Sequence, residues 1–252
     1  MLFRKVQLGY LIVLGCILGL SLFYDLRILW AGVVVSIFYV AVIIYGSFRM
    51  DAGLYAKAIC KANHPSHIFT LSFDDGPDPI YTLQILDILE KYKARAIFFC
   101  IGHKIEKHPN ILNEIKNKGH LIGNHSYSHT TRHGFLGVKA IESEIQQTES
   151  LIKKTTGHSN KLYRPPFGVT NPRIASVIKR YGLKLVGWNI RSFDTVAKDP
   201  MSIMQRIQNV QAGDIVLLHD TIAHTATVLD DFLKITTAKG LQADIIPELI
   251  HE

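Results

Sequence analysis

Two adjacent carboxylates, Asp74 and Asp75, end an apolar run of the chain and are followed by a Gly-Pro turn. Neighbouring acids repel each other and are costly to desolvate, so the end of a buried strand rarely carries two of them unless a cation lies there. An ordinary turn would give the same pattern, because Asp before Gly-Pro is a common turn signal. The pair alone therefore predicts either a cation site or a turn.

Two histidines, His125 and His129, follow a later apolar segment with three residues between them. This spacing can bring two imidazoles to one side of a metal ion. With one carboxylate they make a set of three ligands that leaves positions for water and substrate, which suits catalytic zinc and also non-haem iron. The alternative is a pair of solvated loop histidines, but beside the Asp74-Asp75 pair we interpret them as ligands.

The elements that would position these side chains begin at residue 67, where apolar β-type runs start to alternate with helical patterns. This alternation predicts a parallel α/β sheet, and about seven parallel strands with helices between them favour a (β/α) barrel, complete or incomplete. The expected strands are 67–73, 96–101, 120–124, 161–164, 184–189, 214–218 and 243–246. The expected helices are 80–92, 104–118, 137–156, 171–181, 200–210 and 226–239.

Polar side chains end or follow five of the expected strands. Besides the acid pair and the two histidines, they are Arg164, Trp188, Asp194 and His219. In barrels of parallel strands the functional residues lie at the carboxyl ends of the strands. We therefore expect these side chains to meet at one edge. Trp188 could equally be a core residue.

The first 50 residues contain two uncharged runs, 8–24 and 28–48, separated by Asp25-Leu26-Arg27. About 20 apolar residues suffice to cross a bilayer. A single anchor or a cleaved signal peptide is the alternative, but no small-x-small cleavage site follows the first run. We predict an anchor of two transmembrane helices over residues 1–50, a linker over 51–66 and a folded domain over 67–252, giving a multi-pass protein of the cell membrane that contacts lipid.

Composition excludes some classes of protein. The 252 residues carry a formal net charge of +7, but Lys and Arg are scattered with no run longer than two. The electrostatic footprint of a nucleic-acid-binding protein is therefore missing, and we expect no nucleic-acid partner. The three cysteines, Cys16, Cys60 and Cys100, are an odd and widely spaced set that does not make a disulfide framework.

Four motifs, in order, resemble those of the polysaccharide deacetylase family, the NodB-homology proteins of carbohydrate esterase family 4. The similarity covers about residues 67 to 248, and four motifs in the family's order are a specific signal. The motifs are Ser72-Phe73-Asp74-Asp75-Gly76-Pro77, His125-Ser126-Tyr127-Ser128-His129, Arg164-Pro165-Pro166-Phe167-Gly168 and Leu217-Leu218-His219-Asp220.

The resemblance implies a role for each site residue. Asp74 would be the general base, and Asp75 would bind the metal with His125 and His129. Arg164 would pair with the base, and His219 would be the general acid, tuned by Asp194. Leu217 would line the acetate pocket, and the backbone N–H of Phe167 would help to bind the oxyanion. The cofactor would be one divalent ion, with zinc expected and cobalt or another ion as alternatives.

This chain departs from the family pattern at two places. Phe167 stands where the family usually has Tyr, which a backbone contact tolerates. Thr195 follows Asp194 where the family usually has Trp, so one aromatic wall of the sugar groove is lost. Trp188 is a candidate for lining the site in its place. These departures weaken the prediction of substrate most.

The resemblance implies a distorted (β/α) barrel. It also implies an enzyme that removes acetyl groups, with N-acetyl groups expected, from a glycan such as peptidoglycan, a chitin-like oligosaccharide or xylan. The alternatives are an inactive membrane-tethered glycan-binding relative and a different metal enzyme, such as an amidohydrolase, on the same site. Because the expected polymers lie outside the cell, we expect the domain to face outward. The positions of Arg4, Lys5 and Arg49 favour the opposite side by the positive-inside rule.

Overall fold

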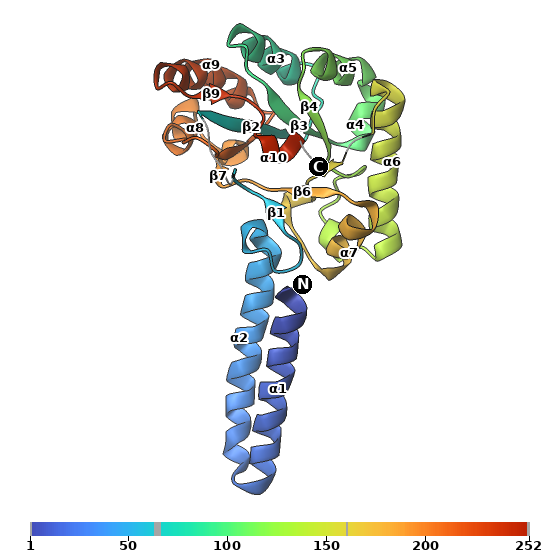
Figure 1. The fold of residues 1–252 in the computed structure, drawn as a ribbon, viewed down its shortest axis with the longest axis vertical. Helices are drawn as coiled ribbons and strands as arrows, with labels where there is room; N and C mark the ends of the chain where they lie inside the picture. The colour runs from blue at the N-terminus through green and yellow to red at the C-terminus, as the bar shows by residue number, and fades with distance from the viewer. Residues whose placement is uncertain (1, 63–66, 160, 251–252) are drawn as a thin grey trace.

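The computed structural model of the chain describes residues 2–62, 67–159 and 161–250. A hairpin of two long helices projects from a body in which helices surround a parallel sheet (Figure 1). The first residues of the chain and the end of the second helix both lie at the body, and the loop between the two helices lies at the far end.

The sheet contains parallel strands whose order along the sheet is β1-β6-β5-β4-β3-β2-β8-β7, with β9 also pairing with β2. Their bounds are β1 (Ala58–Ile59), β2 (Ile68–Asp74), β3 (Ala96–Cys100), β4 (Leu121–Asn124), β5 (Leu162–Tyr163), β6 (Lys184–Val186), β7 (Ile190–Arg191), β8 (Ile215–His219) and β9 (Gln242–Ala243). All the named pairings are parallel, so the carboxyl ends of the strands share one edge.

The sheet curls until its two margins meet. β6 and β7 are separated by only three residues in the chain, yet they lie near opposite ends of the strand order. The segment after β1 also reaches the segment before β8, where the Ala62 N–H donates to Gly213 O at 2.8 Å. This curling confirms the predicted distorted (β/α) barrel.

β2 is the central strand and is buried along almost its whole length, because both neighbours and the outer helices cover its apolar side chains. Phe73 stacks on Phe98 of β3 with ring centroids 5.0 Å apart. The register places Asp74 opposite His219 of β8 and Phe99 of β3. The buried position of β2 between its neighbours therefore fixes the position of Asp74 at its carboxyl end.

The helices of the body confirm the sequence pattern in most places. They are α3 (Tyr81–Lys91), α4 (Gly102–Lys107), α5 (Pro109–Asn117), α6 (Val138–Thr156), α7 (Pro172–Tyr181), α8 (Pro200–Ile207), α9 (Ala223–Ala238) and α10 (Pro247–Ile250). The helix expected over 104–118 is two helices. Pro109 begins the second one, since proline lacks the N–H that would continue the first.

Several expected strands are shorter than predicted, and the strand over 161–164 is limited to Leu162–Tyr163. The strand over 184–189 ends at Val186, because the Val186 and Gly187 carbonyls accept hydrogen bonds from the side chain of Arg164. The strand over 243–246 is limited to Gln242–Ala243, and Pro247 then begins α10.

The hairpin consists of α1 (Leu2–Phe23) and α2 (Leu29–Phe48). The candidate spans, 2–23 and 26–48, have mean hydropathies of 2.1 and 2.5, and only 6% of each apolar window is buried in the protein. Both are long and apolar enough to cross a bilayer, a test that a signal sequence near the N-terminus also passes.

The segment expected to be a linker, 51–66, is largely built into the body. It contains β1, which pairs with β6, and its side chains Leu54, Tyr55 and Cys60 are buried. Residues 63–66 lie outside the described residues. The sequence did not reveal this packing because the strand is only two residues long and its partners are more than 100 residues away.

Candidate active site

Arg164 follows β5 and brings a buried guanidinium to the carboxyl end of β2. Its Nη1 donates to Asp74 Oδ1 at 2.6 Å and to Ser72 Oγ at 3.0 Å. Its Nε donates to Val186 O at 3.0 Å, and its Nη2 donates to Gly187 O at 2.8 Å. The guanidinium is therefore held on three sides and gives Asp74 a fixed ionic partner.

Two aromatic rings cover the same guanidinium. Its Cζ lies 4.1 Å from the ring centroid of Phe99 and 5.3 Å from that of Trp188. Burial lowers the pKa of Arg164, and the neighbouring Asp74 carboxylate opposes this effect. Removing one partner of such a buried pair costs about 3–5 kcal/mol, because the other charge is left unpaired. Trp188 therefore contacts the guanidinium of Arg164, which in turn binds Asp74.

Asp75, His125 and His129 form a second cluster beside this pair. Each offers one ligand atom, and these atoms all lie within 4.8 Å of one another. Asp75 Oδ1 is 3.2 Å from His129 Nε2 and 3.5 Å from His125 Nε2, and it is buried without a hydrogen-bond partner among the described residues. An unsatisfied buried carboxylate oxygen between two imidazole nitrogens fits a divalent cation.

The backbone fixes how His125 faces the cluster. Its Nδ1–H donates to Arg164 O at 2.7 Å, which leaves the lone pair of Nε2 facing Asp75. A metal-binding histidine is commonly oriented in this way, by a hydrogen bond from the ring nitrogen that does not bind the metal. Burial disfavours the charged form, but the carboxylates of Asp74 and Asp75 raise the pKa of His125 above its usual value. Burial and the neighbouring His125 lower the pKa of His129 to about 4.

The charges of its neighbours also set the ionisation state of Asp75, the third candidate ligand. Burial alone would raise the pKa of Asp75, but the neighbouring imidazoles of His125 and His129 hold that pKa well below its usual range. Asp75 is therefore an ionised carboxylate at neutral pH, which is the form that binds a cation.

The loops that carry these ligands are strained. Six of the described non-glycine residues have positive φ, and four of them, Asp75, Ser126, His129 and Phe167, belong to loops at this edge. Left-handed backbone at such residues costs on the order of 1 kcal/mol or more and concentrates at functional sites. Glu144 of α6 holds the histidine loop by accepting the backbone N–H groups of residues 127 and 128 at 3.0 and 2.8 Å.

His219 ends β8, and a buried carboxylate orients it. Its Nδ1–H donates to Asp194 Oδ1 at 2.7 Å, and its backbone N–H donates to Asp194 Oδ2 at 2.7 Å. Thr225 Oγ1 donates to the same Oδ2 at 2.7 Å. Burial would lower the pKa of His219, but the hydrogen bond to Asp194 and the charge of that residue raise it. His219 therefore keeps its proton to a higher pH than a free imidazole.

The remaining predicted residues line the same edge. Leu217 is buried and precedes His219 by two positions, so both side chains lie on one face of β8. Phe167 is 52% exposed, and its ring centroid lies 4.9 Å from that of His129. Gly168 has φ +67, and a Cβ there would overlap Trp188, so this turn requires glycine.

Three residues that support the site were not predicted. Ser72 accepts from Arg164, Thr225 donates to Asp194, and Glu144 caps the histidine loop. Ser72 belongs to a recognised motif, whereas Thr225 and Glu144 lie in ordinary helical sequence without a signal. Asp220 is also buried beneath the site. Burial raises the pKa of Asp220 to about 7, and Thr82 Oγ1 donates to its Oδ2 at 2.6 Å.

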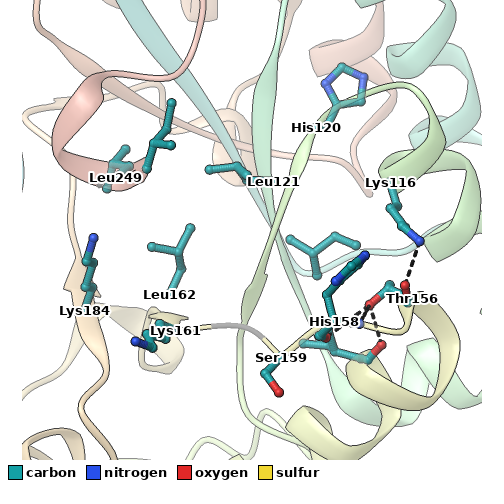
Figure 2. Close-up of a pocket in the computed structure, with 13 residues that line it drawn as sticks. Lys116, His120, Leu121, Thr156, His158, Ser159, Lys161, Leu162, Lys184 and Leu249 are labelled. Carbon is teal, nitrogen blue, oxygen red and sulfur yellow. Dashed lines mark hydrogen bonds between the residues drawn. The ribbon is translucent and has the colours of Figure 1, made fainter. Parts of the chain in front are cut away.

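Figure 2 shows a separate cavity of about 360 Å³ at the amino ends of β4, β5 and β6. Lysines gather around it, and Lys116 Nζ donates to Thr156 O at 2.6 Å. Because this cavity lies at the edge opposite the acid and histidine clusters, it is not the place where those groups meet a substrate.

The geometry offers three chemical groups at one edge: a cation site with open positions, a carboxylate paired with Arg164, and an imidazole paired with Asp194. A bound cation can polarise a carbonyl, a carboxylate can accept a proton from water, and an imidazolium can donate one to a leaving group. The arrangement is suited to hydrolysis of an amide or an ester.

The same residues decide the family of the chain. The family model described as polysaccharide deacetylase matches residues 61–186, which include the acid pair, both histidines and Arg164. The chain belongs to the polysaccharide deacetylase family. His219 and Asp194 lie beyond the matched range, so their assignment depends on the geometry described above.

Relatives within the polysaccharide deacetylase family act on peptidoglycan, as their names state. A peptidoglycan-N-acetylglucosamine deacetylase of Bacillus cereus is 34% identical over 194 residues, covering 73% of this chain and 88% of that protein. The peptidoglycan-N-acetylmuramic acid deacetylase PdaC of Bacillus subtilis is 36% identical over 186 residues, covering 72% of this chain. The match spans only 38% of the length of PdaC.

Solved structures of the family share the fold. The family 4 carbohydrate esterase of Streptomyces lividans, determined in complex with acetate, is 31% identical, with a TM-score of 0.68. The match covers 73% of this chain and 94% of that one.

Proposed function

We propose that the protein is a metal-dependent hydrolase that removes N-acetyl groups from a peptidoglycan-like glycan. The observation that carries this proposal is the meeting of three pairs or clusters at one edge of the barrel: Asp74 with Arg164, the three-ligand cluster, and His219 with Asp194. The peptidoglycan deacetylases among the relatives support the choice of substrate class.

In this proposal Asp75, His125 and His129 hold one divalent ion, with zinc preferred because two histidines and a carboxylate are typical catalytic zinc ligands. The bound ion would polarise the acetyl carbonyl and make a water molecule more acidic. Asp74 accepts the proton of the attacking water, and Arg164 holds that carboxylate in place.

Protein groups also stabilise the intermediate and the leaving group. The backbone N–H of Phe167 donates to the developing oxyanion. His219 donates its proton to the departing nitrogen, since an amide nitrogen must be protonated to leave at neutral pH. Asp194 keeps His219 charged for this step. Leu217 lines the pocket for the acetyl methyl group, and Trp188 forms a wall of the site.

The hairpin over residues 1–50 anchors the enzyme in the membrane, with the catalytic domain following it. The described apolar side chains of both helices are mostly exposed, which suits lipid contact rather than a soluble core. Since peptidoglycan lies outside the membrane, the domain faces outward in this proposal. The basic residues at the body end of the hairpin, Arg4, Lys5 and Arg49, favour the other side, so protease added to intact cells provides the test.

Acetate release from a panel of substrates tests the function. The panel contains peptidoglycan, chitooligosaccharides, acetylated xylan and lipid-linked N-acetyl sugars, each with zinc, with cobalt and without added metal. We expect acetate and one equivalent of free amine from N-acetylated glycans only when metal is present. Absence of acetate from every member of the panel would contradict the proposal.

A further inference from the structure

A cavity of about 340 Å³ lies between the end of the membrane hairpin and the catalytic edge. One wall is the end of α2 and the turn after it, and the other is the segment that crosses from β6 through β7. The lining residues are Phe48, Arg49, Met50, Asp51, Trp188, Asn189, Arg191 and Phe193. We call this cavity the Arg191 pocket.

The pocket shares its inner wall with the catalytic site. Trp188 covers the guanidinium of Arg164, and Phe193 directly precedes Asp194. Arg191 is the register partner of Leu217 on β8. Register partners point to the same face of a sheet, so Arg191 shares a face with Leu217 and with His219 two residues later.

The outer wall lies at the depth of the lipid head groups. α2 has 20 residues, and at a rise of about 1.5 Å per residue it spans roughly the 30 Å of a bilayer's hydrocarbon core. Arg49 follows directly and therefore reaches the interface. The hairpin is also fixed to the catalytic edge, because the Thr170 N–H, two residues after Gly168, donates to Ser47 O of α2 at 2.9 Å.

The charges of the pocket favour an anion. Arg49 is neutralised by Asp51, which accepts from its Nε at 2.9 Å and from its Nη2 at 2.6 Å. Arg191, in contrast, has no ion pair within the described residues, and its Cζ lies 4.7 Å from the ring centroid of Phe193 and 5.8 Å from that of Trp188. Arg206 approaches the same ring at 4.7 Å. An unpaired guanidinium presents a fork that suits the oxygens of a phosphate.

We propose that the Arg191 pocket binds the phosphate of a saccharide that is joined through that phosphate to a membrane lipid. The lipid stays in the bilayer beside α2, the phosphate lies on Arg191, and the N-acetyl sugar reaches the three-ligand cluster. The reaction is the proposed hydrolysis: the water oxygen bonds to the acetyl carbon, the C–N bond breaks, and the nitrogen takes a proton. The phosphate linkage is unchanged. This inference rests on the proposed function and narrows its substrate to a lipid-linked glycan unit.

Two matched probes test the inference with the full-length protein in phosphatidylcholine vesicles. Dodecyl phospho-N-acetylglucosamine and dodecyl N-acetylglucosaminide have the same sugar and chain and differ in the phosphate. We expect the kcat/KM of the wild type to be at least about tenfold higher for the phosphate probe, since charge-assisted bidentate hydrogen bonds are about twice as strong as neutral ones. Arg191→Ala should bring the ratio towards one, and Arg191→Lys should retain part of it.

Arg180→Ala is the matched control, because Arg180 is an exposed arginine that precedes β6 at the opposite edge of the sheet. The ratio should be unchanged in this variant. Equal rates on both probes in the wild type, or an unchanged ratio in Arg191→Ala, would overturn the inference. Loss of the preference on adding phosphatidylglycerol or inorganic phosphate at the same concentration as the probe would assign the pocket to ordinary head groups or free phosphate, and would also overturn it.

A binding measurement separates this inference from the proposed function. Trp188 lines the pocket, and Trp30 is the only other tryptophan of the sequence, so fluorescence of a Trp30→Phe protein reports on the pocket. If neither probe releases acetate, the proposed function fails for this sugar. Tighter binding of the phosphate probe that depends on Arg191 then still supports the pocket, and equal binding of both probes overturns it.

Discussion

The guanidinium of Arg164 gives the site its fixed geometry. It joins the end of β2 to the carbonyls after β6 and, through its own carbonyl, orients His125. A single buried residue therefore sets the position of both the carboxylate at residue 74 and one imidazole of the ligand cluster. The two adjacent acids have separate partners, Asp74 with Arg164 and Asp75 with the histidines.

This separation predicts the effect of Asp74→Asn. The variant removes the proposed base and leaves the buried Arg164 without an opposite charge, which lowers stability. It keeps an oxygen that can accept from Arg164 and leaves Asp75, His125 and His129 in place, so the folded protein should retain its metal. Activity should fall by about 10²–10⁴-fold, the usual contribution of general acid–base catalysis. Acetate release and metal analysis of the same preparation give the measurement, with the exposed Asp87→Asn as the control. Loss of metal in proportion to activity would show that Asp74 is instead a ligand.

The pair of His219 and Asp194 predicts a pH dependence. Asp194 raises the pKa of His219, so the proposed general acid would stay protonated, and activity would persist, to higher pH. Asp194→Asn removes this charge, lowers the pKa of His219, and should move the alkaline limb of kcat/KM to lower pH. Asp231→Asn, an exposed substitution on α9, should leave the limb in place. An unmoved limb in Asp194→Asn would mean that another group sets it.

At the scale of elements, the end of α2 packs against the catalytic body and is hydrogen-bonded to it. Tyr55 and Leu54 are buried between Ala175 of α7 and the ends of α1 and α2. The Phe3 N–H donates to Leu54 O at 2.9 Å, and Thr170 bonds to the end of α2. The junction therefore holds the loop that carries Phe167, and the hairpin has a structural role in addition to anchoring.

Gly46 of α2 packs against the side chain of Leu54, and substitution of this glycine tests the junction. A Cβ at this position would overlap the side chain of Leu54, which is buried and cannot easily move. Gly46→Ala should therefore destabilise the body by about 1–3 kcal/mol, the usual cost of overpacking. Gly9→Ala is the control, because nothing lies within 4 Å of its Cβ position. Thermal unfolding of the two detergent-solubilised variants makes the comparison, and equal midpoints would contradict the packing described for the junction.

Across the whole molecule, two apolar helices whose side chains are mostly exposed predict integral membrane attachment. The full-length protein should remain in the membrane fraction after alkaline carbonate and high salt, because only detergent can replace the lipid around α1 and α2. A peripheral protein used as a marker in the same sample should be released. Release of this protein by carbonate would show that the hairpin does not span the bilayer.

The residues at the carboxyl ends of the strands could be predicted from the sequence, whereas β1 and the side chains that hold these residues in place could not. Strands such as Ile68–Asp74 are buried on both faces and read as apolar runs, so their ends could be located and the residues after them brought together. β1 could not be predicted, because its burial depends on β6, which is distant in the chain. The pairing of Thr225 with Asp194 likewise arises only when two segments that are distant in the chain meet.

Metal-dependent acetate release tests the central claim most directly. The full-length protein is stripped with a chelator, reloaded with zinc and assayed on an N-acetylated glycan, beside the double variant His125→Ala/His129→Ala and the control His108→Ala/His224→Ala. The account predicts about one ion per chain in the wild type and the control, activity that returns with zinc, and neither metal nor activity in the double variant. Full metal content or full acetate release in His125→Ala/His129→Ala would contradict it.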